Sequence, residues 1–116
     1  MHAGLTGLVW GGLVRALVLH HVTYSINSLC HFFGRRDYVT GDESRNLGWL
    51  SLITFGESWH NNHHAFPTSA RHGLRRWQID PSWIVIRIME AAGLVWDVVR
   101  VHERRQERKA LTADAR

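Results

Sequence analysis

The chain has 116 residues, which is enough for one small domain and too few for two. Its net charge of +4 suits an anionic membrane surface or a phosphate-bearing ligand, and a nucleic-acid partner is set aside because no binding module accompanies the charge. The single cysteine, Cys30, excludes an intrachain disulfide and argues against a thiolate zinc site. Nine histidines and six tryptophans together indicate a metal site close to a bilayer.

The first predicted element is a long apolar helix. Arg15 is the only charge between residues 3 and 19, and the helix is expected to continue to Phe33, which makes it longer than a bilayer core is thick. A signal peptide fits poorly because a basic n-region and a cleavage site are missing, whereas a half-buried soluble helix is the other reading. We predict a transmembrane helix that Gly34 ends.

The second predicted element follows a polar loop at residues 35–46. A helix is expected to begin between Asp42 and Asn46 and to end before Pro67, because proline disfavours helical backbone in the residue before it. The apolar part of this helix is too short to span a bilayer.

The third predicted helix has a clear start signal, with Asp80 at the N-cap and Pro81 at the first helical position. Apolar residues keep helical spacing as far as Val98, which predicts an amphipathic helix packed on protein or lying on lipid. From His102 onward the charges lose their apolar partners, so a frayed tail is expected.

The strongest functional signal is a group of three histidines near residue 60. His60, His63 and His64 would share one face of a helix, and three imidazoles converging in this way can hold a first-row transition metal. The spacing alone is only a hypothesis. It is supported by the apolar lead-in, by Glu57 within reach of the histidines and by the closing Pro67.

A second signal is a polar stripe in the first helix. His20, Tyr24, Asn27 and His31 are spaced at i, i+4, i+7 and i+11, so they fall on one face. A polar stripe in an apolar span is expected to face a bundle interior and a functional site. The alternative is that each group only hydrogen-bonds to a neighbouring helix.

These two signals resemble a known family. Residues 27–31, Asn-Ser-Leu-Cys-His, resemble the Asn-Ser-x-x-His element of membrane-bound fatty acid desaturases, and residues 56–67 resemble their third histidine box, Gly-Glu-x-x-His-Asn-x-His-His-x-Phe-Pro. The order and separation are similar to the stearoyl-CoA Δ9-desaturase branch. The resemblance extends from about residue 8 to residue 101 and corresponds to the last third of a full-length family member.

The resemblance implies a role for individual residues. His31 would be an iron ligand, together with the three histidines of the third box, His60, His63 and His64. Asn27 would hold a metal-bound water. Tyr24 stands where many relatives have tryptophan and would line the acyl tunnel.

Other polar residues are given supporting roles or none. Glu57 or Asn61 would fix the tautomers of the ligand rings. Arg75 and Arg76 would either mark the cytoplasmic side of the membrane or bind the phosphates of an acyl-donor head group. No ligand role is assigned to His20 or His21. Three more histidines are interpreted as ordinary surface residues: His2, His72 and His102.

The resemblance also implies a fold and an activity. The fold would be all-α, with residues 1–109 forming the C-terminal portion of a desaturase domain and residues 110–116 a disordered tail. The complete enzyme would use two irons and O2 to introduce a cis double bond into an acyl-CoA or acyl-lipid. Electrons would come from a ferredoxin or from cytochrome b5 with its reductase. The protein would be integral to the membrane, with its histidine side facing the cytoplasm.

One departure from the family bears on activity. The first two histidine boxes of the family are absent from this sequence, so only four matched ligands exist where about twice that number is needed. We predict that the isolated chain neither binds two irons tightly nor desaturates. Two alternatives remain: a fatty acyl hydroxylase of the same fold, and a non-catalytic, membrane-associated metal-binding protein.

Overall fold

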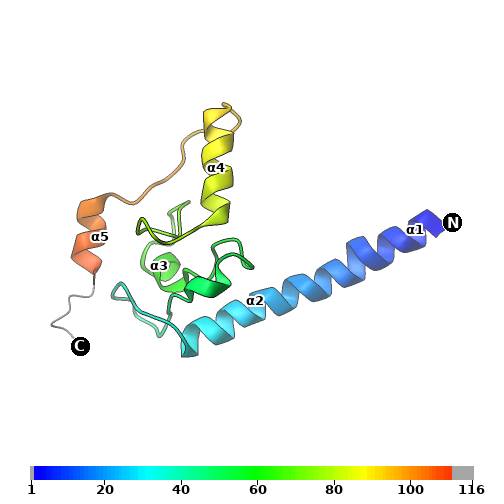
Figure 1. Ribbon diagram of the computed structural model, residues 1–116, viewed down its shortest axis with the longest axis horizontal. Helices are drawn as coiled ribbons and strands as arrows, with labels where there is room; N and C mark the ends of the chain where they lie inside the picture. Colours follow the sequence, from blue (N-terminus) through cyan, green and yellow to red (C-terminus); the bar gives the residue numbers. More distant parts are fainter. Residues whose placement is uncertain (1, 111–116) are drawn as a thin grey trace.

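The computed structural model describes residues 2–110, which form helices and irregular segments (Figure 1). Within this range the only β-structure is a set of isolated bridges, and no strand is formed. The prediction of an all-α chain is therefore confirmed.

The chain begins with one long helix. Helix α1 (His2–Gly7), the π-helical segment η1 (Leu8–Val14) and helix α2 (Arg15–Phe32) follow one another as a single 31-residue helix that projects from the rest of the chain (Figure 1). At 1.5 Å per residue it spans about 46 Å, against about 30 Å for a bilayer core. By length and composition, it is long and apolar enough to cross a membrane. It buries only Ile26 and Cys30.

The predicted second helix is wrong over most of its length. The structure contains a 3-10 turn, η2 (Gly48–Leu50), then a series of turns, and only afterwards the short helix α3 (His60–Ala65). The backbone angle φ is positive at Phe55 (53°) and Gly56 (95°), which a continuous right-handed helix does not allow. Gly56 also packs directly on Asp80, because a Cβ at this glycine would lie 2.3 Å from a carboxylate oxygen of that residue.

Helix α4 (Pro81–Ala91) begins where the sequence predicts. The Asp80 side chain accepts a hydrogen bond from the backbone N–H of Trp83 at 3.0 Å. The prediction that this helix continues to Val98 is wrong, because Gly93 takes a φ of 71° and the backbone N–H of Leu94 bonds back to the carbonyl of Met89. This Schellman ending redirects the chain.

The predicted frayed tail is replaced by helix α5 (Glu103–Lys109), which His102 caps with its side chain. Two contacts hold its end against the rest of the chain: the backbone N–H of Val39 donates to the carbonyl of Lys109, and Nζ of Lys109 donates to the carbonyl of Ala65 at 2.7 Å. Ala110, predicted as part of the disordered tail, pairs with Tyr38 in an isolated bridge. Residues 111–116 of that prediction lie outside the described residues.

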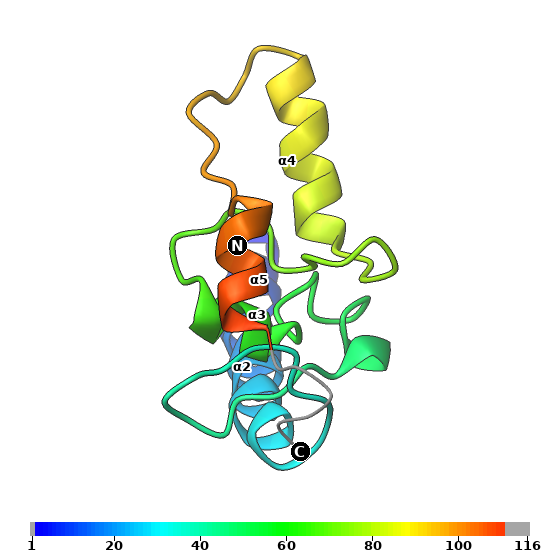
Figure 2. The same cartoon turned by 90° about the vertical axis from the view of Figure 1, so that its left-hand side faces the viewer.

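The interior around α3 is more polar than apolar. Its centre is a closed ring of four buried side chains, in which Asn46 donates to Asp37 and Asn62, Asn62 donates to Gln78, and Gln78 donates back to Asp37. The four distances lie between 2.7 and 3.0 Å. Buried hydrogen-bonded networks of this kind rigidify the structure and favour a single packing. Helix α4, by contrast, projects away from this region in both views (Figure 1, Figure 2).

Candidate metal centre

The end of the long helix is anchored beside α3 by a short loop. The backbone N–H of Arg45 donates to the carbonyl of Cys30 at 2.6 Å, and that of Leu47 donates to the carbonyl of Ser58 at 3.0 Å. Ile26, Cys30 and Leu50 pack together as a small apolar cluster at the same place. These contacts bring the last turn of α2, which carries His31, next to the first turn of α3, which carries His60.

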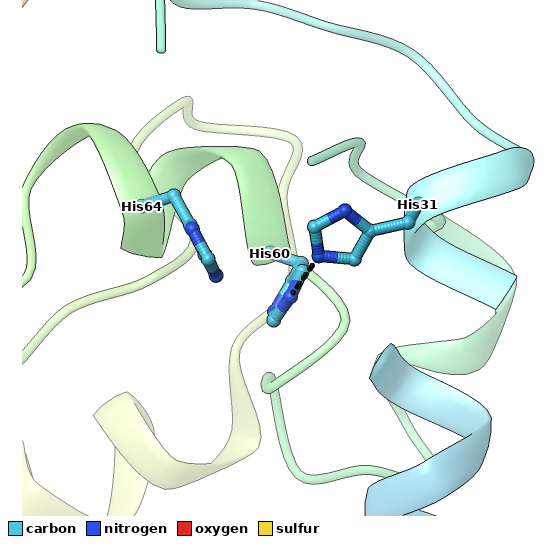
Figure 3. A group of neighbouring side chains, drawn as sticks. All are labelled: His31, His60 and His64. Carbon is cyan, nitrogen blue, oxygen red and sulfur yellow. Dashed lines mark hydrogen bonds between the residues drawn. The ribbon is translucent and has the colours of Figure 1, made fainter. Parts of the chain in front are cut away.

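Three imidazoles meet at this junction (Figure 3). Nε2 of His31 lies 3.2 Å from Nε2 of His60, and a nitrogen from each of His31, His60 and His64 falls within 4.8 Å of the others. Two ring nitrogens bound at right angles to one metal at about 2.1 Å are about 3 Å apart. The spacing of these nitrogens therefore fits a shared first-row transition metal, for which imidazole is a suitable ligand.

His63 does not join this group. Its ring centroid is 6.4 Å from that of His60, whereas it lies 4.7 Å from the ring of His72. His60, His63 and His64 nevertheless line one cavity, and the i, i+4 pair of His60 and His64 is the part of this face that belongs to the close group. His72, which the sequence analysis interprets as an ordinary surface histidine, is instead a close neighbour of the site.

Burial favours the neutral form of His60 and His63. Burial, together with smaller contributions from the neighbouring His64 and His31, lowers the pKa of His60 to about 4. Burial likewise lowers the pKa of His63, with a smaller contribution from His72. Since a metal ligand must present a lone pair, neutral imidazoles near pH 7 fit the donor set that iron would need.

Asp42 orients His64, a role that the sequence analysis assigns to Glu57 or Asn61. Oδ2 of Asp42 lies 2.5 Å from Nδ1 of His64, and its Oδ1 accepts the backbone N–H of Ser44. Burial raises the pKa of Asp42, but the hydrogen bonds from Ser44 and His64 outweigh it and hold this pKa well below its usual range. A carboxylate on Nδ1 leaves Nε2 of His64 as the lone-pair nitrogen.

The two residues predicted to support the rings have different surroundings. The side chain of Asn61 accepts the backbone N–H groups of Asp37 and Tyr38 and donates to the Tyr38 carbonyl, so it positions α3 on the preceding loop and does not bond to a ring. Glu57 is half-exposed and lies 3.9 Å from Nδ1 of His72.

A cavity of about 480 Å³ opens between the long helix and the histidines. Asn27 lines it from α2, together with His60, His63 and His64. The wall is completed by Glu57 and by three further α2 side chains, Leu19, Thr23 and Ile26. Tyr24 does not line this cavity; it is 65% exposed and stacks on His20. The remaining histidines predicted to lack a ligand role lie on exposed positions: His2, His21 and His102.

Arg75 and Arg76 do not line the cavity beside the histidines. Both line a second cavity of about 300 Å³ together with Tyr38 and Gln106. Nε of Arg75 is 3.5 Å from the buried carboxylate of Asp37, so part of its charge is already balanced.

These features define a class of protein, a helical chain that joins a bilayer-length apolar helix to a centre built from histidine. Within that class the chain belongs to the fatty acid desaturase family, whose family model matches residues 1–97. The resemblance found in the sequence is thereby confirmed.

Several plant proteins are similar to the chain. Delta-9 acyl-lipid desaturase 1 of Arabidopsis thaliana is 53% identical over 108 residues, which cover 93% of this chain and 35% of the relative. The chloroplastic palmitoyl-monogalactosyldiacylglycerol delta-7 desaturase of the same plant is 46% identical, over 96% of this chain and 30% of the relative. The acyl-CoA C20 Delta5-desaturase of Anemone leveillei is 42% identical, over 94% and 36%. The chain spans about a third of the length of these relatives.

Proposed function

We propose that this chain is the C-terminal part of an O2-dependent di-iron desaturase that introduces a cis double bond, at a Δ9-like position, into the acyl chain of an acyl-CoA or acyl-lipid. The observation that carries the proposal is the meeting of His31, from the end of the long helix, with His60 and His64 from α3. A helix that ends on a cluster of imidazoles brings an apolar wall and a candidate metal site into contact.

Each histidine of the centre receives a role under this proposal. His31, His60 and His64 would hold one iron, and Asn27, which lines the same cavity, would hold a water bound to it. His63 lines the same cavity as His60 and His64 but lies outside the close group of three rings, so it is available to the second iron. The remaining ligands would come from residues outside this chain, since the first two boxes of the family are absent from its sequence.

Bound iron would supply, with dioxygen, the strong oxidant that removal of hydrogen from an unactivated methylene group requires. In the overall reaction the acyl chain loses two hydrogens, two electrons and two protons arrive from a donor, and O2 is reduced to two waters. The residues of this chain would position the substrate: apolar side chains of α2 line the cavity that ends on the histidines, which would place one bond of the acyl chain near the centre and exclude water from it.

The membrane and redox partners follow from the same arrangement. The imidazole cluster lies at the C-terminal end of the long helix, and Arg35 and Arg36 follow directly after this end. Positive residues favour the cytoplasmic side of a membrane. We therefore expect an integral membrane protein whose histidine side faces the cytoplasm. A ferredoxin, or cytochrome b5 with its reductase, would deliver electrons there.

Arg75 and Arg76 are proposed to contact the acyl-donor head group, because both line a cavity next to the polar interior. Charge reversal at Arg76, which is exposed and has no partner among the described ion pairs, should weaken binding of the acyl donor to the complete enzyme. Unchanged affinity would assign Arg76 to membrane topology alone.

A chimeric enzyme tests the proposed function. This chain would replace the matching segment of Delta-9 acyl-lipid desaturase 1 of Arabidopsis thaliana, and the fatty acids of a host that expresses the chimera would be analysed by gas chromatography and mass spectrometry. We expect a new cis monoene in the chimera, none in its His60→Ala variant, and none with the isolated chain. A hydroxylated product, or the same yield from the His60→Ala variant, would refute the proposal.

A further inference from the structure

His72 is fixed beside the metal centre by its backbone. Its N–H donates to Oδ2 of Asp80 at 2.8 Å, and its carbonyl accepts a hydrogen bond from Nδ2 of Asn62 at 2.7 Å. The next residue, Gly73, also donates its N–H to Asp80. Asn62 and Asp80 are both buried, so the loop position does not depend on the imidazole of His72.

The side chain of His72 lies between a carboxylate and a candidate iron ligand. Its Nδ1 is 3.9 Å from Oε1 of Glu57, and its ring centroid is 4.7 Å from that of His63. Nδ1 of His63 is buried and has no hydrogen-bond partner among the described residues. A buried, unpaired ring nitrogen is costly unless a neighbour satisfies it, and His72 is the ring nearest to His63.

We propose that His72 is a positioning residue for His63, and that Glu57 orients His72 for this role. The inference rests on the proposed function only in taking His63 as an iron ligand. In this arrangement the Glu57 carboxylate, 3.9 Å from Nδ1 of His72 in the structure, would accept a hydrogen bond from Nδ1–H of His72. The Nε2 lone pair of His72 would then accept the Nδ1–H of His63, and Nε2 of His63 would be left unprotonated for a metal.

The three groups supply donors and acceptors in the required order. A carboxylate only accepts, a neutral imidazole donates from one nitrogen and accepts at the other, and a metal requires a lone pair. Asp42 has the corresponding role for His64, because its carboxylate is hydrogen-bonded directly to Nδ1 of that ring. His63 would thus be oriented through an intervening histidine, whereas His64 is oriented by a carboxylate alone.

The tautomer of His63 gives a readout that needs neither iron nor enzymatic activity. The chain would be labelled with [15N]histidine, placed in detergent micelles at neutral pH, and studied by long-range proton–nitrogen correlation, with the His63 signals assigned by their loss in a His63→Asn variant. We expect the Nδ1–H tautomer of His63 in the wild type and in His72→Gln, whose amide can still accept that proton. In His72→Leu we expect the Nε2–H tautomer that isolated imidazole side chains favour.

Two further variants make every outcome decisive. His21→Leu removes an exposed histidine of α2 and should leave the His63 signals unchanged. Glu57→Ala, at a half-exposed side chain, should shift His63 partly toward the Nε2–H form, and it decides the matter if His72→Leu does not fold. An unchanged tautomer in His72→Leu or in Glu57→Ala would overturn the proposal, as would equal shifts in His72→Leu and His72→Gln.

In the chimeric enzyme the same variants separate this inference from the proposed function. Loss of a group behind a metal-bound histidine typically lowers metal affinity about 10- to 100-fold. We expect His72→Leu to lose one of two irons to a competing chelator more readily than His72→Gln does. Two irons held equally by both variants would refute the role of His72 while leaving the desaturase assignment intact.

Discussion

Residues 2–32 form one helix whose side chains are largely exposed and apolar, whereas residues 35–80 follow an irregular path around buried amides and carboxylates. The helix satisfies its own backbone and needs a non-polar surrounding for its side chains. The irregular segment satisfies its backbone through particular side chains such as Asn61 and Asp80. The candidate metal centre lies where the two meet, so its geometry depends on contacts between the helix and the second region.

The largest effect is expected at Asp80, which holds the irregular segment together. Asp80→Ala removes three hydrogen bonds from backbone N–H groups, those of Trp83, His72 and Gly73. Hydrogen bonds to a charged group contribute about 1.5–3 kcal/mol each, so we expect a loss of about 4 kcal/mol or more in the free energy of unfolding. Denaturant titration followed by tryptophan fluorescence measures it. Glu43→Ala, at an exposed residue with surface ion pairs only, should change the same quantity by less than about 1 kcal/mol.

A charge in the middle of the long helix tests its need for a non-polar surrounding. Leu17 is 60% exposed in the structure, and Leu17→Arg should make membrane insertion less favourable by about 2.5–3.5 kcal/mol. A glycosylation-mapping insertion assay in microsomes gives this value, with Leu17→Ile as the control. Equal insertion of the two variants would mean that this helix does not enter lipid.

Gly34 joins the two regions and should be sensitive to any side chain. Its φ is 110°, and a Cβ there would lie 2.4 Å from the backbone carbonyl oxygen of Asn46. Gly34→Ala should lower the free energy of unfolding by about 1–3 kcal/mol from backbone strain. Gly41→Ala places its Cβ in open space and should change it by less than about 0.5 kcal/mol. Similar midpoints for both variants in denaturant would contradict this expectation.

The smallest expected effect concerns metal affinity and not stability. Asp42→Asn replaces the carboxylate behind His64 and should weaken Co²⁺ binding to the chain about 10-fold, with no change in the unfolding midpoint. The Co²⁺ titration would be monitored by the visible absorption of the bound metal. The neighbouring Glu43→Gln serves as the control, and a matching loss of affinity in that variant would show that general charge, not the Asp42 contact, is responsible.

The contrast between the two regions also explains which predictions from the sequence are right. The long helix and the start of α4 are set by residues close in sequence, an apolar run in one case and Asp80 with Pro81 in the other, so their signals are local. The failure of the second predicted helix comes from positive φ angles at Phe55 and Gly56, where packing against Asp80 overrides an apolar pattern that favours a helix.

The residues of the candidate site also differ in whether the sequence alone could predict them. The motif identifies His31, His60 and His64, and the structure gathers these three rings. The sequence does not predict that Asp42 and His72 lie beside the site, because each is in a loop whose position relative to the histidines depends on the fold. The spacing of two residues between Asp42 and Ser44, typical of a side-chain-capped turn, is the one local signal that could have drawn attention to Asp42.

The closed ring of Asp37, Asn46, Asn62 and Gln78 has a consequence for biosynthesis. Chains emerge from the ribosome N-terminal end first, and this ring is complete only once Gln78 is available. The ring fixes α3 against its loops, so the histidine cluster cannot take its final geometry while the long helix alone has been made. Under the proposed function, iron would therefore be loaded late, after the long helix has been made and the segment beyond the histidines has arrived.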